Sequence, residues 1–222
     1  MLKIIQKLWL MMISLTISVY QAADAETVRY EFHPMGKLNR IEVELSKGKF
    51  FGEGNVKGVF KNIQGTLNFS LEQPHLTSGN ILLNAHALHF GYHKVDGDSK
   101  NTTWLNVEKF PEIIFELKKL SKSRWSNNML EAEAIGILFV KSKKIQINFP
   151  VKIKFGRSLR KEIDGKQGDL LLMKGEFKLS RSELGINPDK MLNIIADELN
   201  IKISLAGCTM KSRPLLPSKL FF

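Results

Sequence analysis

The chain of 222 residues is 43% hydrophobic and 25% charged, with a formal net charge of +11 at pH 7. Its length and apolar content suffice to bury a core, and a chain of this size is routinely one domain. The single cysteine, Cys208, excludes an intrachain disulfide. The lysine excess comes without an arginine-rich or aromatic-interleaved basic motif, so we expect no nucleic-acid partner. The charge fits a solvated outer face first and attraction to anionic lipid head groups second.

The first residues are typical of a secretory signal peptide. Lys3 and Lys7 precede an apolar, charge-free run at 8–19, and residues 23–25 form a small-x-small cleavage pattern. An uncleaved membrane anchor is the less favoured alternative, because the run falls short of the roughly 20 residues that a transmembrane helix needs. We therefore expect residues 1–25 to be removed and the protein to be periplasmic or secreted.

The rest of the chain alternates apolar and polar residues with the period of β-strands. In the clearest run, Ile145 to Phe155, the odd positions are all apolar and the even positions are Gln, Asn, Pro or Lys. Successive side chains of a strand point to opposite faces, so one face is apolar and the other is wet. The same pattern predicts further strands at 28–33, 40–45, 63–72, 80–90, 113–120, 129–140, 171–179 and 199–205.

Short turn-forming segments, such as 46–49, 126–128 and 141–144, separate these strands. Short connections favour antiparallel neighbours and exclude a parallel doubly wound sheet. Strands with one apolar face form either a two-sheet sandwich or a closed barrel, and a barrel of about eight strands can enclose an elongated ligand. Small inward residues would leave room along its axis: Gly65, Ala85, Ala87, Ala132, Ala134, Gly136 and Gly175. Periodicity alone leaves open whether Phe69, Phe149 and Phe177 fill that room.

Three histidines, His86, His89 and His93, fall within eight positions and raise the possibility of a metal site. On a continuous strand His86 and His89 face opposite sides and cannot bind one ion together. No HxH, HExxH or CxxC spacing is present, so we expect no metal, with a secreted metalloenzyme built on the three histidines as a minor alternative. We expect His86 on the outer face and His89 at the inner end of its strand, near the mouth of a cavity.

Between Phe90 and Ile113 the alternation breaks, and residues 98–103 are of types that start helices. We expect an excursion with a short helix near residues 91–106 that covers one end of the barrel. Long structured loops on a rigid scaffold often carry binding specificity. Catalytic motifs such as GxSxG or GxxxxGK[ST] are absent from the sequence, and we expect no enzyme.

Four segments carry a resemblance to a known family. Residues 56–65 read VKGVFKNIQG, 104–115 read WLNVEKFPEIIF, 136–150 read GILFVKSKKIQINFP and 175–186 read GEFKLSRSELGI. In order and spacing they resemble the signature blocks of the YceI-like, polyisoprenoid-binding proteins, and the resemblance spans residues 28–205. Of the R-D-x-H-L segment that many members carry, only Asp96 is present.

This resemblance implies an all-β fold, a single antiparallel lipocalin-like barrel that holds a long amphiphilic lipid such as an isoprenoid. We expect the barrel domain at 26–207 and a flexible C-terminal tail at 208–222. The expected mouth residues are His89, Asp96 and Trp104. The expected interior lipid-binding residues are Phe69, Leu83, Ala85, Phe115, Ile147, Phe149, Val151 and Phe177.

The function expected from these observations is non-enzymatic carriage or storage of a long-chain isoprenoid or fatty-acid-like lipid, with no cofactor besides that lipid. Each buried methylene contributes roughly 0.8 kcal/mol, so a long tail binds tightly with few polar contacts. The alternative is a barrel with a closed core whose outer face binds an envelope protein or an anionic membrane surface.

Overall fold

The computed structural model describes residues 26–47 and 55–210. The expected signal peptide at 1–25 and most of the expected tail, from residue 211 onward, lie outside the described residues. In the two described ranges, the helices are all too short or too polar to cross a membrane.

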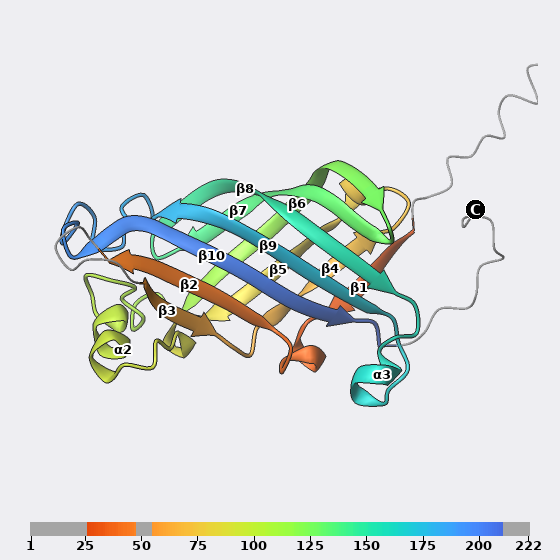
Figure 1. Cartoon of the computed structure of the whole chain (residues 1–222), viewed down its shortest axis with the longest axis horizontal. Coiled ribbons are helices and arrows are strands. Elements are labelled where there is room, and N and C mark those ends of the chain that lie inside the picture. The colour runs from red at the N-terminus through yellow and green to blue at the C-terminus, as the bar shows by residue number, and fades with distance from the viewer. Residues whose placement is uncertain (1–25, 48–54, 211–222) are drawn as a thin grey trace, which may run out of the picture.

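The described chain is dominated by antiparallel strands that wrap around one axis (Figure 1). Short helices lie between some of them: the 3-10 helices η1 (His33–Met35), η3 (Pro74–Leu76) and η4 (Ala85–Ala87), and the α-helices α2 (His93–Lys100) and α3 (Lys161–Asp164). The strands are β1 (Thr27–Glu31), β2 (Arg40–Lys47), β3 (Asn55–Phe60), β4 (Gln64–Ser70), β5 (Ser78–Asn84), β6 (Glu112–Ser126), β7 (Met129–Val140), β8 (Lys143–Gly156), β9 (Leu170–Ser180) and β10 (Ile195–Cys208).

These ten segments fill eight positions around a closed ring. β1 and β2 both pair with β10, and their other neighbours are β4 and β3 respectively. Successive segments β1 and β2 therefore share one position, and β3 and β4 share the next. The other six strands each occupy one position, in chain order from β5 to β10. The prediction of an all-β antiparallel barrel of about eight strands is confirmed, and the sandwich is excluded.

One buried asparagine keeps the ring closed where its first strand position is interrupted. Helix η1, with a proline in its first turn, separates β1 from β2. The chain therefore lacks, at this point, the backbone hydrogen bonds that a continuous strand would form with β10. Asn39 replaces them: its Nδ2 donates to the carbonyl of Phe32 at 2.7 Å, and its Oδ1 accepts from the backbone N–H of Ala206 at 2.5 Å. Both ends of the Asn39 side chain are thus satisfied in a buried position, as buried polar groups require.

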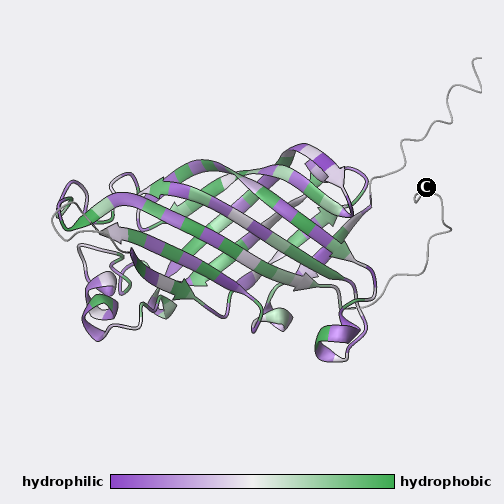
Figure 2. Cartoon of the chain, in the orientation of Figure 1, coloured by the Kyte–Doolittle hydropathy of each residue, from purple (hydrophilic) through white to green (hydrophobic). Residues whose placement is uncertain are grey.

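The outer face of the barrel is solvent-exposed and charged. Figure 2 shows hydrophilic and hydrophobic residues alternating along the strands. Outward lysines lie next to carboxylates of neighbouring strands, as at Lys152 and Glu131, 3.1 Å apart, or Lys202 and Glu176, 3.6 Å apart. Exposed pairs of this kind add little stability, so they chiefly keep the surface soluble.

The half of the interior nearer α3 is filled by side chains. Large residues of β1 and of β6 to β9, together with Phe32 next to β1, are completely buried there: Tyr30, Phe32, Leu120, Leu130, Ile153 and Leu171. Tyr30 also packs edge-on against Phe69, with ring centroids 6.3 Å apart. This half is a conventional close-packed core.

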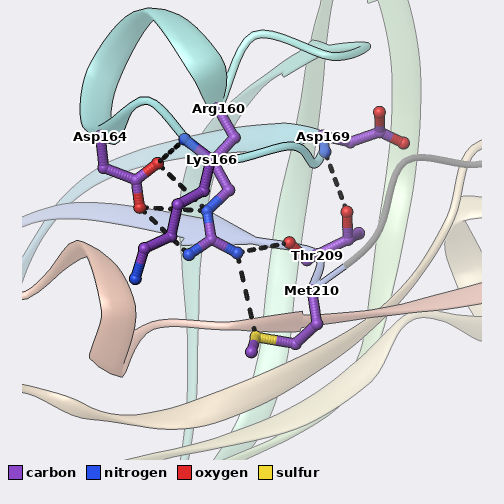
Figure 3. Close-up of polar contacts among 6 residues, drawn as sticks. All are labelled: Arg160, Asp164, Lys166, Asp169, Thr209 and Met210. Carbon is purple, nitrogen blue, oxygen red and sulfur yellow. Dashed lines mark hydrogen bonds and ion pairs between the residues drawn. The ribbon is translucent and has the colours of Figure 1, made fainter.

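A buried arginine closes the α3 end of the barrel (Figure 3). The guanidinium of Arg160 pairs with Asp164 of α3 at 3.0 Å, and its Nη1 donates to the carbonyl of Thr209 at 2.9 Å. Thr209 in turn accepts a hydrogen bond on Oγ1 from the backbone N–H of Asp169 at 2.9 Å. Strand β10 runs to Cys208, so Cys208 and Thr209 are buried in this end of the barrel.

Two local predictions were wrong. The predicted strand 80–90 ends at Asn84, because the Asn84 side chain accepts a hydrogen bond from the backbone N–H of His86 and starts η4. The phase that placed His89 inward is therefore lost. Strand β3 escaped prediction, because its inward position Gly58 interrupts the apolar pattern where the ring of Phe90 packs against it. The short helix expected near 91–106 is confirmed as α2.

Gly136 provides a test of barrel packing. A methyl group added there would meet the carbonyl oxygen of Glu116 on β6 and the ring of Phe115. We expect Gly136→Ala to lower the free energy of unfolding by about 1–3 kcal/mol, because a backbone atom cannot yield cheaply. The matched control is Gly97→Ala in α2, where an added methyl meets open space and favours the helix. Urea unfolding that shows equal stability for the two variants would contradict this packing.

Candidate functional site

The half of the barrel away from α3 holds a cavity of about 510 Å³. Its wall is almost entirely apolar, built from inward side chains of β2, β3 and β5 through β10, with Ile41, Leu83, Leu138, Leu179 and Ile201 as examples. The excursion that contains α2 and the loop between β9 and β10 form its mouth. The interior is therefore filled in one half and open in the other.

Three aromatic rings separate the two halves. Phe149 stacks on Phe177, with centroids 4.2 Å apart and planes 18° apart, and packs against Phe115 at 5.5 Å. Phe115 and Phe149 line the cavity and also a small void of about 20 Å³ that lies toward the filled half. The rings of Phe115, Phe149 and Phe177 therefore form the floor of the cavity.

The cavity does not arise from small residues, contrary to the expectation. None of the glycines and alanines expected to point inward is among the lining residues described, and Ala87 is exposed on η4. A methyl group added at Gly136 would overlap the ring of Phe115, and one added at Gly175 would lie 3.4 Å from the ring of Phe149. Gly136 and Gly175 therefore accommodate the floor rings, while the open space is bounded mostly by leucine, isoleucine and valine side chains.

The residues expected inside the barrel divide between its two halves. Five of them line the cavity: Leu83, Phe115, Ile147, Phe149 and Phe177. The other three are buried away from it. Phe69 packs on Tyr30, Val151 lies in the close-packed core, and Ala85 is buried in η4.

Polar lining atoms gather at the mouth, from Ser46, Asp98, Ser99, Asn101, Thr103, Asn187 and Lys190. Asn101 organises much of this region, since its Oδ1 accepts hydrogen bonds from the backbone N–H groups of Thr103 and Trp104 and from the hydroxyl of Thr103. Leu105 is buried in this turn, and both Trp104 and Leu105 line the cavity. In the local sequence WLNV, Leu105 and Val107 are buried, whereas Trp104 and Asn106 are partly exposed.

A fully buried arginine holds the β9–β10 loop at this mouth. Arg181 donates to five backbone carbonyls of the residues that surround it, those of Ile186, Asn187, Lys190, Ile195 and Ala196. Its guanidinium also lies 5.7 Å from the ring centre of Trp104, an arrangement that favours a cation–π contact. Burial lowers the pKa of Arg181, while the nearby carboxylates of Asp197 and Asp189 act against that shift. Arginine stays charged in proteins, so the loop is assembled around a cation.

The carboxylate of Asp197 holds the chain on either side of Arg181. It accepts hydrogen bonds from the hydroxyls of Ser180 and Ser182, both at 2.5 Å, and from the backbone N–H of Ser182 at 3.0 Å. Burial raises the pKa of Asp197, but these hydrogen bonds outweigh it and leave the pKa below its ordinary value. Asp197 is therefore ionised near neutral pH and balances the charge of Arg181.

His89 and Asp96, expected at the mouth, form a contact beside it and do not line the cavity. The His89 side chain is 73% exposed, and its Nδ1 lies 2.8 Å from Asp96 Oδ2. Asp96 Oδ1 accepts the backbone N–H of Phe90 at 2.5 Å, and this hydrogen bond holds the pKa of Asp96 below its ordinary value. Asp96 therefore positions α2 over the barrel.

The described residues contain no group of three or more His, Cys, Asp or Glu side chains arranged to hold a metal ion. His86 lies exposed on η4 and His93 lies exposed at the start of α2. The three histidines that prompted the metal alternative are thus distributed over three local structures.

Comparison with known proteins adds to this geometry. The chain matches the family model described as a YceI-like domain over residues 30–206. UPF0312 proteins of Yersinia pestis and Yersinia pseudotuberculosis are each 25% identical over 111 residues, which are 50% of this chain and 56% of each relative. The chain thus aligns with little more than half the length of these curated relatives.

Solved structures share the fold. Burkholderia cenocepacia BcnA has a TM-score of 0.60 at 17% identity, over 75% of this chain and 95% of that one. The Campylobacter jejuni YCEI protein has a TM-score of 0.61 at 16% identity, over 71% and 87%. A polyisoprenoid binding domain from Saccharophagus degradans, implicated in plant cell wall breakdown, has a TM-score of 0.58 at 6% identity, over 84% and 99%.

Arg181 is expected to be essential to the mouth. Arg181→Met leaves several buried carbonyls without a donor, and we expect the free energy of unfolding to fall by about 3 kcal/mol or more. Arg181→Lys keeps the charge and three donors and should recover part of that loss. Urea unfolding measures both variants. Equal stability of Arg181→Met and the wild type would show that the loop does not depend on this side chain.

The contacts of Asp96 predict that the local stability of α2 depends on pH. Because the folded pKa of Asp96 lies below its ordinary value of 3.8, its stabilising effect is present above about pH 4 and is lost as the pH falls through the folded pKa. We expect Asp96→Ala to speed amide hydrogen exchange in residues 92–100 at pH 7, with the difference from wild type closing in acid. Asp98→Ala is the control, since the side-chain partner of Asp98 among the described residues is the exposed Lys94 of the same helix. Equal exchange in both variants at pH 7 would rule out a positioning role for Asp96.

Proposed function

Because the chain belongs to the YceI-like domain family, we propose that it is an exported, non-enzymatic binding protein that holds a long-chain amphiphile, such as an isoprenoid or a fatty-acid-like lipid, for carriage or storage. The family expected from the four sequence segments is confirmed. The observation that carries the proposal is the apolar cavity of about 510 Å³, floored by aromatic rings and polar only at its mouth.

The distribution of polar atoms supports an amphiphile with its tail inward. Small-molecule sites typically have volumes of about 300–1,000 Å³ and a mostly apolar lining, and this cavity falls within that range. A hydrocarbon tail against the leucine, isoleucine and phenylalanine wall contributes roughly 0.8 kcal/mol per buried methylene. The head group would then lie among Asn101, Thr103, Asn187 and Lys190, where hydrogen bonds are available.

The non-enzymatic role is supported by what a buried tail would touch. In the described part of the wall, the polar and ionisable side chains lie at the mouth, and the deep lining is hydrocarbon and aromatic. General acid–base or nucleophilic catalysis requires a titratable or nucleophilic group within hydrogen-bond reach of the reacting atoms. A chain held against the floor would meet none among the lining residues described.

Two further observations support the choice of ligand and compartment. The Saccharophagus degradans domain that shares this fold is a polyisoprenoid binding domain, which makes a branched isoprenoid a suitable first candidate. The signal-peptide pattern of residues 1–25 supports delivery to the periplasm or beyond, where a lipid must cross water between membranes.

The direct test is identification of the lipid that accompanies the protein. Protein purified from its own host would be analysed by native mass spectrometry, followed by organic extraction and lipid analysis. We expect a mass above that of the mature polypeptide and an extractable long-chain amphiphile. A lipid-free mass, together with no binding of fluorescent isoprenoid or fatty-acid probes, would reject the proposal.

Blocking the cavity should abolish probe binding without disturbing the fold. Leu83 lines the cavity from β5, so Leu83→Trp places a bulky ring in the space for the tail. We expect at least about a tenfold weaker affinity for a fluorescent isoprenoid, equivalent to about 1.4 kcal/mol. The matched control is Leu82→Trp, at the preceding residue of β5, which points to the opposite face of the sheet. Unchanged probe affinity in Leu83→Trp would place the ligand outside this cavity.

A further inference from the structure

The loop between β9 and β10 exposes three large apolar side chains. Met191 is 47% exposed, Leu192 is 44% exposed and Ile194 is 38% exposed. They follow one another within four residues, whereas most exposed apolar residues of the described chain are scattered singly, which is ordinary for a protein surface. Contiguous exposed apolar side chains of this kind are typical of an interaction site.

This loop is part of the cavity mouth. Lys190 and Met191 line the cavity, so the side chains that border the opening continue directly onto the exposed tip. The backbone N–H of Asn187 donates to the carbonyl of Thr103 at 2.9 Å, which joins the loop to the excursion on the other side of the mouth. Figure 1 shows the β9–β10 loop and α2 at the same end of the barrel, opposite α3.

Hydrogen bonds within the β9–β10 loop hold the exposed tip in place. Arg181 binds the loop carbonyls, and the backbone N–H groups of Ile194 and Ile195 both donate to the carbonyl of Met191. Asn187, Asp189 and Met191 adopt left-handed backbone conformations, with φ of 43°, 55° and 59°. Asparagine and aspartate tolerate this conformation, whereas for methionine it is unfavourable and persists where the surroundings enforce it. The apolar side chains are therefore presented to solvent by a fixed loop.

Lysines flank the tip. Lys141 Nζ donates to the carbonyl of Gly185 at 2.7 Å, and the side chain of Lys143 passes close to Gly185, which places the β7–β8 turn beside the loop. The two segments 141–144 and 183–194 together carry four lysines against two carboxylates, Glu183 and Asp189. Lys143, Lys144 and Lys190 form no ion pair with any described residue. The loop that carries the apolar tip thus lies beside a turn with unpaired positive charge.

We propose that this surface, Met191, Leu192 and Ile194 with the flanking Lys143, Lys144 and Lys190, docks the mouth of the barrel onto an anionic lipid bilayer. Apolar side chains at a fixed tip insert at the boundary between head groups and acyl chains, and lysines beside them attract the negative surface. The charge complementarity favours an anionic bilayer over a protein groove. The purpose of docking rests on the proposed function, because a mouth pressed to a bilayer lets a hydrocarbon tail pass without exposure to water.

Vesicle flotation tests the proposal with the mature protein. The probes are phosphatidylcholine vesicles with and without phosphatidylglycerol, at low and high salt. We expect binding to the vesicles that contain phosphatidylglycerol, weaker binding to pure phosphatidylcholine, and a further loss at high salt. The triple variant Met191→Ser, Leu192→Ser, Ile194→Ser should bind at least about tenfold more weakly, because it keeps the lysines but loses the apolar tip.

The matched control removes exposed apolar side chains from the opposite end. Leu159 and Ile163, at α3, are 48% and 50% exposed, and the double variant Leu159→Ser, Ile163→Ser should bind vesicles as the wild type does. Thermal unfolding of each variant checks the fold. Binding of a fluorescent isoprenoid in detergent-free solution checks the cavity separately from the docking surface.

The results separate the two proposals. A triple variant that binds vesicles as the wild type does, a control that loses binding equally, or a wild type that binds neutral and anionic vesicles alike would overturn docking by this surface. Wild-type dimers that the triple variant abolishes, without vesicle binding, would assign the tip to a second copy of the chain and also overturn it. Probe binding without vesicle binding would leave the proposed function standing, whereas vesicle binding without any cavity ligand would retain docking alone.

Discussion

Closure of the sheet through β10 is the constraint on which the rest of the structure depends. One strand pairs with β9 on one side and with two successive segments, β2 and β1, on the other. The pairing joins the first described strand to the last, so every inward side chain acquires neighbours from all around the ring. Asn39 maintains the connection across the break at η1. Without that closure there would be neither a close-packed half nor an enclosed cavity.

The interior is divided by aromatic packing. Phe115, Phe149 and Phe177 occupy space that Gly136 and Gly175 leave free, and the resulting floor stops the cavity short of the core beneath it. The core below the floor stabilises the barrel by conventional burial, whereas the wall above it leaves apolar surface without protein neighbours. The same strands therefore stabilise the barrel below the floor and provide the binding wall above it.

Much of the fold could be predicted from the sequence, because strand periodicity is a local property. The alternation from Ile145 to Phe155 and its counterparts indicated antiparallel strands with one apolar face, and the interruption before Ile113 indicated the helical excursion. The choice of a barrel over a sandwich came from the resemblance to the YceI-like family. The phase of His89 could not be predicted, because a single side-chain hydrogen bond at Asn84 ended the strand early. The role of Arg181 also escaped prediction. Its partners are backbone carbonyls, and these leave no pattern in the residue types. The one sequence signal was the position of Arg181, a cation directly after the last residue of β9.

The floor has a consequence for the kinetics of exchange. A tube that is closed at one end lets a bound amphiphile leave only by the path on which it arrived, with the head group first and the tail end last. The time that the ligand spends bound should then lengthen with every carbon added to its tail, while the rate of capture, set by the opening, changes little. Discrimination among chain lengths would therefore be expressed as residence time, and the Phe149–Phe177 stack would set the longest tail that is held in full.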